Sequence, residues 1–197
     1  MLETLRRPPL AVTATAPAGA PEGWLTALPP ATRFAFYGNA AVRAVATTAW
    51  QIGFSEQACR ALSDDRRATL WLGPDEYLLL KWAPKAAEAP PAQSGEAVSL
   101  QHALTGRPYA LVDISHRQFA LMVSGPHSAD ILNGACPLDL DLGAFPIGMC
   151  TRTVFAKADI VLWRRAADRF HLEVWRSFAG YVTGILREAA SEFYPDV

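Results

Sequence analysis

The chain has 197 residues, of which 51% are hydrophobic, so it is long enough to bury a core and too short for more than one large domain or two closely packed halves. Eighteen basic and nineteen acidic side chains give a formal net charge of −1, which provides no long-range field for nucleic acid or anionic lipid. We therefore expect neither nucleic acid nor a membrane among its partners.

The first 30 residues contain six of the fifteen prolines and are predicted to form an extended N-terminal segment. Pro8 and Pro9 directly follow Arg6 and Arg7, so no continuous apolar signal-peptide core is present. No apolar run approaches the roughly 20 residues that span a bilayer. A cytoplasmic location is expected.

Residues 31–84 are predicted to form a first α+β half. Residues 34–37 have the composition of a strand, and apolar residues then recur at helical spacing from Ala41 to Ala49. Two apolar runs, 68–72 and 77–82, are joined by Gly73, Pro74 and Asp75, which favour a tight reversal. This pattern predicts a β-hairpin.

Residues 85–97 are rich in Ala, Pro and small polar residues, which predicts a surface linker before a second half at 98–197. A short helix is expected at 98–104, and strands at 109–115 and 118–124 are predicted to form a second hairpin. Pro126 is well placed to begin a further helix, with Ser124 as its cap.

The C-terminal third is predicted to contain strands at 151–156, 160–164 and 169–175, followed by a helix at 177–193. The predicted apolar face of this helix comprises Phe178, Val182, Ile185, Leu186, Ala189 and Phe193. Recurring hairpins and helices predict an α+β fold of antiparallel or mixed sheets, with helices packed on one face.

Two groups of polar residues have the types needed for catalysis. Asp113, Ser115 and His116 contain the members of a hydrolytic triad, but His116 would point to the opposite strand face and no G-x-S-x-G turn is present. His171 and Glu173 share one strand face, as an acid/base or metal pair would, but a solvated sheet face is favoured because no other histidine or carboxylate has a spacing that would complete a site. Neither group predicts a complete active site.

Cofactor and thiol motifs are absent from the sequence. It has neither a G-x-G-x-x-G nor a G-x-x-x-x-G-K-[ST] loop, so no nucleotide or flavin is expected to be held by this chain. Cys59, Cys136 and Cys150 form no C-x-x-C or zinc pattern. Reduced thiols are expected, either as buried apolar residues or, alternatively, with one of them as a nucleophile.

Tryptophan and arginine occur together at two strand ends, as Trp163-Arg164 and Trp175-Arg176. Both residue types are enriched at protein interface hot spots, so these four residues are candidates for a subunit interface. His116 and Arg117 form a second candidate patch. The alternative is that the tryptophans complete the core and the arginines are ordinary surface charges.

Several segments resemble known families. Residues 112–118 and 121–126, V-D-I-S-H-R-Q and L-M-V-S-G-P, are similar to a segment of the folate-binding aminomethyltransferase superfamily. Together with W-L-G-P-D-E-Y-L-L at 71–79, C-P-L-D-L at 136–140 and D-I-V-L-W-R at 159–164, they resemble the gamma subunits of heterotetrameric sarcosine oxidases. The resemblance covers roughly residues 68–190.

The resemblance implies an aminomethyltransferase-like fold of two related halves, in a non-catalytic subunit with alpha, beta and delta partners. It implies that the complex oxidises sarcosine to glycine, forming hydrogen peroxide and methylenetetrahydrofolate. FAD, FMN, NAD and tetrahydrofolate would then be bound by the other subunits, and this chain would carry no catalytic, cofactor-binding or metal-binding residue.

Three alternatives exist to this assignment, and the sequence disfavours two of them. Transferases of the superfamily carry paired acidic residues where this chain has Ala158 and Asp159, which disfavours a stand-alone folate-dependent one-carbon transferase. None of the cysteines follows Lys-Gly, the motif of the related iron–sulfur assembly factors. A scaffold for a flavoenzyme acting on another N-methyl amine would share every feature of the sequence.

Overall fold

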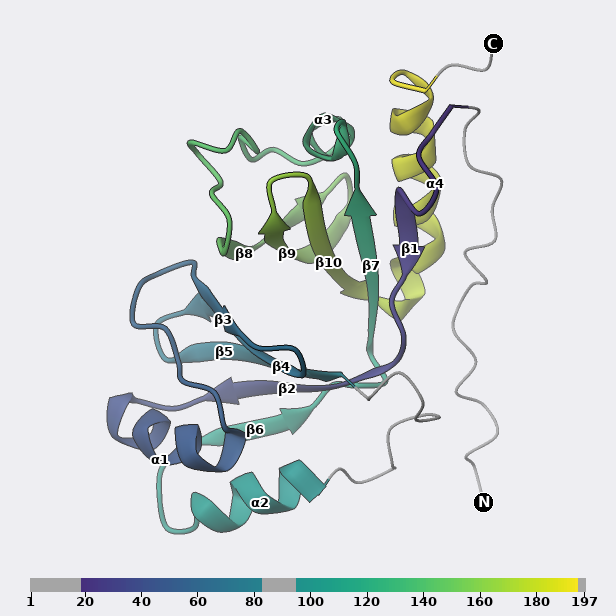
Figure 1. Ribbon diagram of the computed structural model, residues 1–197. Helices are drawn as coiled ribbons and strands as arrows, with labels where there is room; N and C mark the ends of the chain where they lie inside the picture. The colour runs from purple at the N-terminus through teal and green to yellow at the C-terminus, as the bar shows by residue number, and fades with distance from the viewer. Residues whose placement is uncertain (1–18, 83–94, 195–197) are drawn as a thin grey trace, which may run out of the picture. The chain divides into compact units, whose positions relative to one another are not determined.

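The structure, a computed structural model, describes residues 19–82 and 95–194. Their contacts divide the chain into two compact units. Within the described residues, the first unit comprises 29–82 and 95–116, and the second comprises 19–28 and 117–194. Each unit is built around one five-stranded antiparallel sheet (Figure 1).

The sheet of the first unit has the strand order β3-β4-β5-β2-β6. Helices α1 and α2 both pack on one face of it and contact each other (Figure 1). The predicted hairpin is confirmed, since β4 pairs with β5 across the turn at Pro74 and Asp75. The elements are β2 (Ala31–Tyr37), α1 (Ala40–Trp50), β3 (Ala61–Ser63), β4 (Arg67–Gly73), β5 (Glu76–Trp82), α2 (Gly95–Ala103) and β6 (Ala110–Asp113).

The start of α1 shows why the local sequence forms this unit. The Asn39 side chain accepts a hydrogen bond from the backbone N–H of Val42 at 3.1 Å and caps the helix. A Cβ at Gly38 would lie 2.6 Å from Cγ1 of Val42, so only glycine allows this close entry into the helix. Val42, Ala46 and Trp50 then recur at four-residue spacing and are buried against the sheet.

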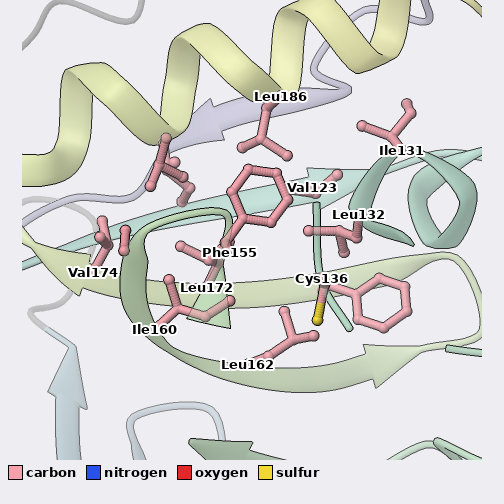
Figure 2. Close-up of a cluster of buried hydrophobic side chains, with 14 of the residues drawn as sticks. Val123, Ile131, Leu132, Cys136, Phe155, Ile160, Leu162, Leu172, Val174 and Leu186 are labelled. Atoms are coloured by element: carbon pink, nitrogen blue, oxygen red, sulfur yellow. The ribbon is translucent and has the colours of Figure 1, made fainter. Parts of the chain in front are cut away.

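The sheet of the second unit has the order β1-β7-β10-β9-β8. Its core lies between the sheet and the helices α3 and α4: Figure 2 shows Leu186 of α4 and Leu132 of α3 among strand residues such as Val123 and Phe155. The elements are β1 (Leu25–Ala27), β7 (Gln118–Ser124), α3 (Ser128–Asn133), β8 (Cys150–Phe155), β9 (Ala158–Ala166), β10 (Arg169–Trp175), the short 3₁₀ helix η2 (Arg176–Phe178) and α4 (Ala179–Ser191).

The strand pairing corrects the predicted division of the chain. Residues 110–113, assigned from sequence to the second half, form β6 and pair with β2 in the sheet of the first unit. β6 and β7 therefore belong to different sheets and form no hairpin. Conversely, β1 lies in the segment predicted to be extended and pairs with β7 in the second unit. Residues 83–94, most of the predicted linker, lie outside the described residues.

Two helix details also differ from the sequence prediction. α3 begins at Ser128 with His127 at its N-cap position, and no side chain caps it, so Ser124 is not its cap. The predicted C-terminal helix is preceded by η2, and the buried residues of α4 are Ala179, Val182, Thr183, Leu186 and Ala190. No helix in the described ranges is long and apolar enough to cross a membrane.

Arg164 holds a loop of the second unit in place from inside. Its side chain is only 3% exposed, and Nη1 donates hydrogen bonds to the carbonyl oxygens of Leu140 (2.8 Å) and Phe145 (2.9 Å). Nε donates to the carbonyl of Ala167 at 3.1 Å. The planar guanidinium thus donates hydrogen bonds to backbone carbonyl groups of two segments, the loop that contains Leu140 and Phe145 and the turn at Ala167.

Replacing Arg164 with methionine should lower the free energy of unfolding by about 3 kcal/mol, because buried carbonyl groups lose their donors. Arg169→Met, at an exposed arginine of the adjoining strand, provides the matched control. Chemical denaturation of both variants measures the difference. Equal unfolding free energies for the two variants would contradict a structural role of the Arg164 guanidinium.

Candidate assembly surface

The structure does not bring the two Trp-Arg pairs together. β9 and β10 are antiparallel, with Arg164 opposite Phe170 and Ile160 opposite Val174. Trp175 therefore lies about five residues, or roughly 16 Å, along the strand from the level of Arg164. The two strand ends that look adjacent in the sequence pattern are opposite ends of the same strand pair.

Trp163 and Arg164 are both interior residues, each 3% exposed. The Trp163 ring lies 4.8 Å below the Arg165 guanidinium and 5.7 Å from the His171 ring, measured to the ring centroids. Arg164 makes the backbone hydrogen bonds described above. Both residues lie inside the second unit. Trp163 is buried as the alternative interpretation stated, whereas Arg164 is neither a surface charge nor an exposed interface residue.

Arg117, Trp175 and Arg176 meet at the surface of the second unit. Trp175 pairs with Gln118 at the end of β10, and the Trp175 side chain is 43% exposed. The Arg117 guanidinium lies over the Trp175 ring, 5.2 Å from its centroid. The backbone N–H of Arg176 donates to the carbonyl of Arg117 at 2.8 Å, which links β7 to η2.

Two more aromatic residues follow Trp175 along the chain. Phe178 and Tyr181 are both more than one-third exposed, and their rings contact edge-to-face with centroids 6.3 Å apart. We call Arg117, Trp175, Arg176, Phe178 and Tyr181 the aromatic–arginine patch. Phe178 was assigned to the buried helix face, and Tyr181 was not selected at all, because the pattern takes no account of the 3₁₀ turn that η2 inserts before α4.

His116 is exposed and directly precedes Arg117. The neighbouring residues form a turn and not a triad. The Ser115 hydroxyl oxygen accepts a hydrogen bond from the backbone N–H of Arg33 at 2.9 Å, while the Asp113 carboxylate accepts one from the backbone N–H of Ser115 at 2.9 Å. Both side chains thus hold the end of β6 against β2.

His171 and Glu173 form a buried pair, which corrects the prediction of a solvated sheet face. The His171 side chain is fully buried, Glu173 is 1% exposed, and Nε2 of His171 lies 2.8 Å from Oε1 of Glu173. The carboxylate thereby fixes the imidazole orientation. The described residues contain no group of three or more His, Cys, Asp or Glu side chains arranged to hold a metal.

The positions relevant to thiol or folate chemistry are poorly placed for it. Cys136 and Cys150 are buried and form no disulfide, and burial raises the pKa of the Cys136 thiol, which disfavours the nucleophilic thiolate. Ala158, where transferases of the superfamily have a carboxylate, is fully buried in the apolar core of the second unit. The Ala158 methyl group can neither bind a pterin as a carboxylate does nor move a proton, and of the two positions only Asp159 is acidic.

Comparison with solved structures defines the class of protein by its fold. Aminomethyltransferase T of the glycine cleavage system from Bartonella henselae matches 82% of this chain and 44% of its own, with a TM-score of 0.55 and 15% identity. At that identity the likeness establishes the fold alone. The chain therefore has an aminomethyltransferase-like α+β fold, as the sequence resemblance predicted.

A second structure is far more similar. A chain of the heterotetrameric sarcosine oxidase from Corynebacterium sp. U-96, solved in complex with pyrrole 2-carboxylate, matches 98% of this chain and 98% of its own, with a TM-score of 0.84 and 28% identity. The sarcosine oxidase gamma subunit family matches residues 37–192. The chain belongs to the sarcosine oxidase gamma subunit family.

Curated relatives agree with this assignment. Sarcosine oxidase gamma subunits from Corynebacterium sp. strain P-1 and strain U-96 are 34% and 35% identical to the chain over 126 residues, or 64% of its length. The subunit from an Arthrobacter species is 32% identical over the same length. The matched region spans 57–58% of the length of these relatives.

Glu173→Ala should lower the free energy of unfolding by about 2–4 kcal/mol, because it removes a carboxylate from a buried hydrogen-bonded pair. Glu173→Gln retains an acceptor oxygen and should cost less. Glu188→Ala, at an exposed position of α4, is the control. The denaturant midpoint of each variant measures the change. If Glu173→Ala and the control have equal midpoints, the His171–Glu173 pair does not stabilise the fold.

Proposed function

We propose that this chain is the non-catalytic gamma subunit of a heterotetrameric sarcosine oxidase complex. The observation that carries the proposal is the match over 98% of both chains with a chain of such an oxidase. A likeness that extends from end to end of both chains supports the same role in an assembly. The fold alone would not, because one fold commonly serves several functions.

The proposed complex oxidises sarcosine with molecular oxygen. Sarcosine, tetrahydrofolate and oxygen would give glycine, methylenetetrahydrofolate and hydrogen peroxide. We assign FAD, FMN, NAD and tetrahydrofolate to the alpha, beta and delta subunits, and a cytoplasmic location to the whole complex. The buried positions of Cys136 and Ala158 support a chain whose contribution is structural.

Within that role, the aromatic–arginine patch is our candidate for a contact with a partner subunit. Trp175 offers a large, rigid ring at the surface, and the Arg117 guanidinium over it leaves two cationic groups, Arg117 and Arg176, beside an apolar area. Tryptophan, tyrosine and arginine supply most hot-spot energy at protein interfaces. His116, exposed beside Arg117, is the remaining member of the originally predicted surface.

The test of the function is to purify the tagged chain from its native host and to assay the recovered material with sarcosine. Recovery of a flavin-containing complex that forms hydrogen peroxide from sarcosine would support the proposal. Recovery of the chain alone, binding tetrahydrofolate and transferring one-carbon units, would instead support the transferase alternative. A flavin-containing complex active only on another N-methyl amine would change the substrate.

Arg176→Glu should weaken assembly without unfolding the chain, and Trp175→Ala should weaken it by about 2 kcal/mol, or roughly 30-fold, because a hot-spot ring is lost. Arg169→Glu makes the same charge change at the other end of β10 and is the matched control. Co-purification yield measures assembly, and circular dichroism checks the fold. Undiminished assembly of the variants at 175 and 176 would exclude the patch as an interface.

A further inference from the structure

A groove runs between α3 and α4 on the second unit, and none of the residues that line it belongs to the aromatic–arginine patch. Its volume is about 570 Å³, within the range of roughly 300–1,000 Å³ that is typical of binding clefts. The two helices pack against each other, and the turn between β8 and β9 reaches the groove through Ala156. All of these elements belong to one unit, so a single folded body forms the site.

The floor of the groove is apolar and comes mainly from α4. Ile185, Ala189 and Phe193 recur at four-residue spacing and line it. Each of these side chains is only partly buried by the rest of the protein. The helix thus presents a row of half-exposed apolar side chains in addition to those that it buries in the core.

Small residues keep this floor open. Gly134 and Ala135 follow α3, and a Cβ at Gly134 would lie 3.3 Å from the Cβ of Ala189, tighter than ordinary van der Waals contact. The backbone N–H of Ala156 donates to the carbonyl of Ala135 at 2.7 Å, which ties the β8–β9 turn to the same wall. The groove therefore has fixed walls and not a loose loop as its border.

The rim of the groove is anionic. Glu188 lies in the last turn of α4, Glu192 is the C-cap residue of that helix, and Asp130 lies on α3. All three are exposed, and none of the described lining residues is basic. The chain as a whole has a net charge of only −1, so three carboxylates around one groove are a local concentration and not a reflection of an acidic protein.

His127 orients one wall. Its ring stacks on Phe193 with centroids 5.1 Å apart, and its Nδ1 lies 3.3 Å from Oδ2 of Asp130. These contacts hold Asp130 near the Phe193 end of the floor. Glu188 and Glu192 are four residues apart at the end of α4, a spacing at which like charges repel each other by a few tenths of a kcal/mol.

We propose that this groove binds an arginine- or lysine-bearing segment of another subunit of the complex. A long cationic side chain has an apolar stem and a charged head, which matches an apolar floor bordered by carboxylates. The stem would lie on Ile185, Ala189 and Phe193. The head would lie among Asp130, Glu188 and Glu192. This inference rests on the proposed function, because it assumes that the chain assembles with other subunits.

The charge of the groove is opposite to that of the aromatic–arginine patch on the same unit. A cationic segment that suits Asp130, Glu188 and Glu192 would be repelled by Arg117 and Arg176. Juxtaposed like charges at an interface cost several kcal/mol, so the two surfaces select different partner segments. The groove therefore adds a second, chemically distinct contact and does not extend the first.

The test compares charge-reversed chains in the intact complex. Glu188→Lys/Glu192→Lys changes the charge of the chain by +4, and Glu56→Lys/Asp65→Lys makes the same change at two exposed sites of the first unit. Each tagged full-length chain is purified from its native host at two salt concentrations, and its molar ratio to the other subunits is measured. Denaturant unfolding of each isolated chain checks that the fold is unchanged.

At low salt, the amount of the other subunits that co-purifies with Glu188→Lys/Glu192→Lys should be lower than with the control by a factor of about ten or more. Glu188→Gln/Glu192→Gln should show a smaller loss, together with a weaker dependence of assembly on salt. Retention of the other subunits by Glu188→Lys/Glu192→Lys at the level of the control would overturn the proposal while leaving the proposed function intact.

Two other outcomes separate the remaining possibilities. If the unaltered chain recovers no other subunit, the proposed function fails and the groove proposal fails with it. If the isolated chain forms a dimer that Glu188→Lys/Glu192→Lys abolishes and the control retains, the occupant is a second copy of this chain, and the proposed cationic segment of another subunit is wrong.

Discussion

Strand β10 pairs with β7 along one side and with β9 along the other, and these two sets of hydrogen bonds hold a single register. In that register Phe170, Leu172 and Val174 enter the apolar core, while His171 and Glu173 point to the opposite face. A shift by one residue would exchange these two sets. The same register brings Trp175 to the end of the strand beside Gln118, where the chain turns into η2 and α4. The position of Trp175 in the aromatic–arginine patch thus depends on how β10 is paired.

Local patterns were sufficient for most of the individual elements. Strict alternation over residues 118–124 predicted β7 with its observed bounds, and the turn residues after β4 predicted its pairing with β5. Pairing between distant segments left no comparable signal. β1 has only three residues, and β6 and β7 are separated by four residues yet enter different sheets. Which strand joins which sheet is decided by long-range burial, and a periodicity of two contains no information about the partner.

For the candidate surface too, local sequence was informative about individual residues and uninformative about which distant segments meet. Residue type drew attention to two Trp-Arg pairs alike, but the structure exposes Trp175 and buries Trp163 and Arg164. Whether a Trp-Arg pair is buried or exposed depends on two features of the fold. One is the end of the antiparallel strand pair at which it lies, and the other is whether backbone carbonyl groups of a nearby loop accept hydrogen bonds from the arginine. Arg164 is buried because the carbonyl groups of Leu140, Phe145 and Ala167 converge on it. The acidic groove was missed for a related reason, since Asp130 and Glu188 are far apart in sequence and only the packing of α3 on α4 joins them.

Aminomethyltransferase T shares the fold of this chain at only 15% identity, and one fold commonly serves several functions. Ala158, for which the sequence resemblance implies an acidic residue in the transferases, is buried here among apolar side chains. A charged group there would now be costly, because it would have neither water nor a partner. Side chains of opposite charge lie near the two ends of α4: Arg176 precedes its start, and Glu188 and Glu192 lie at its end. Two oppositely charged surfaces favour different partner segments, which is the role that we propose for them.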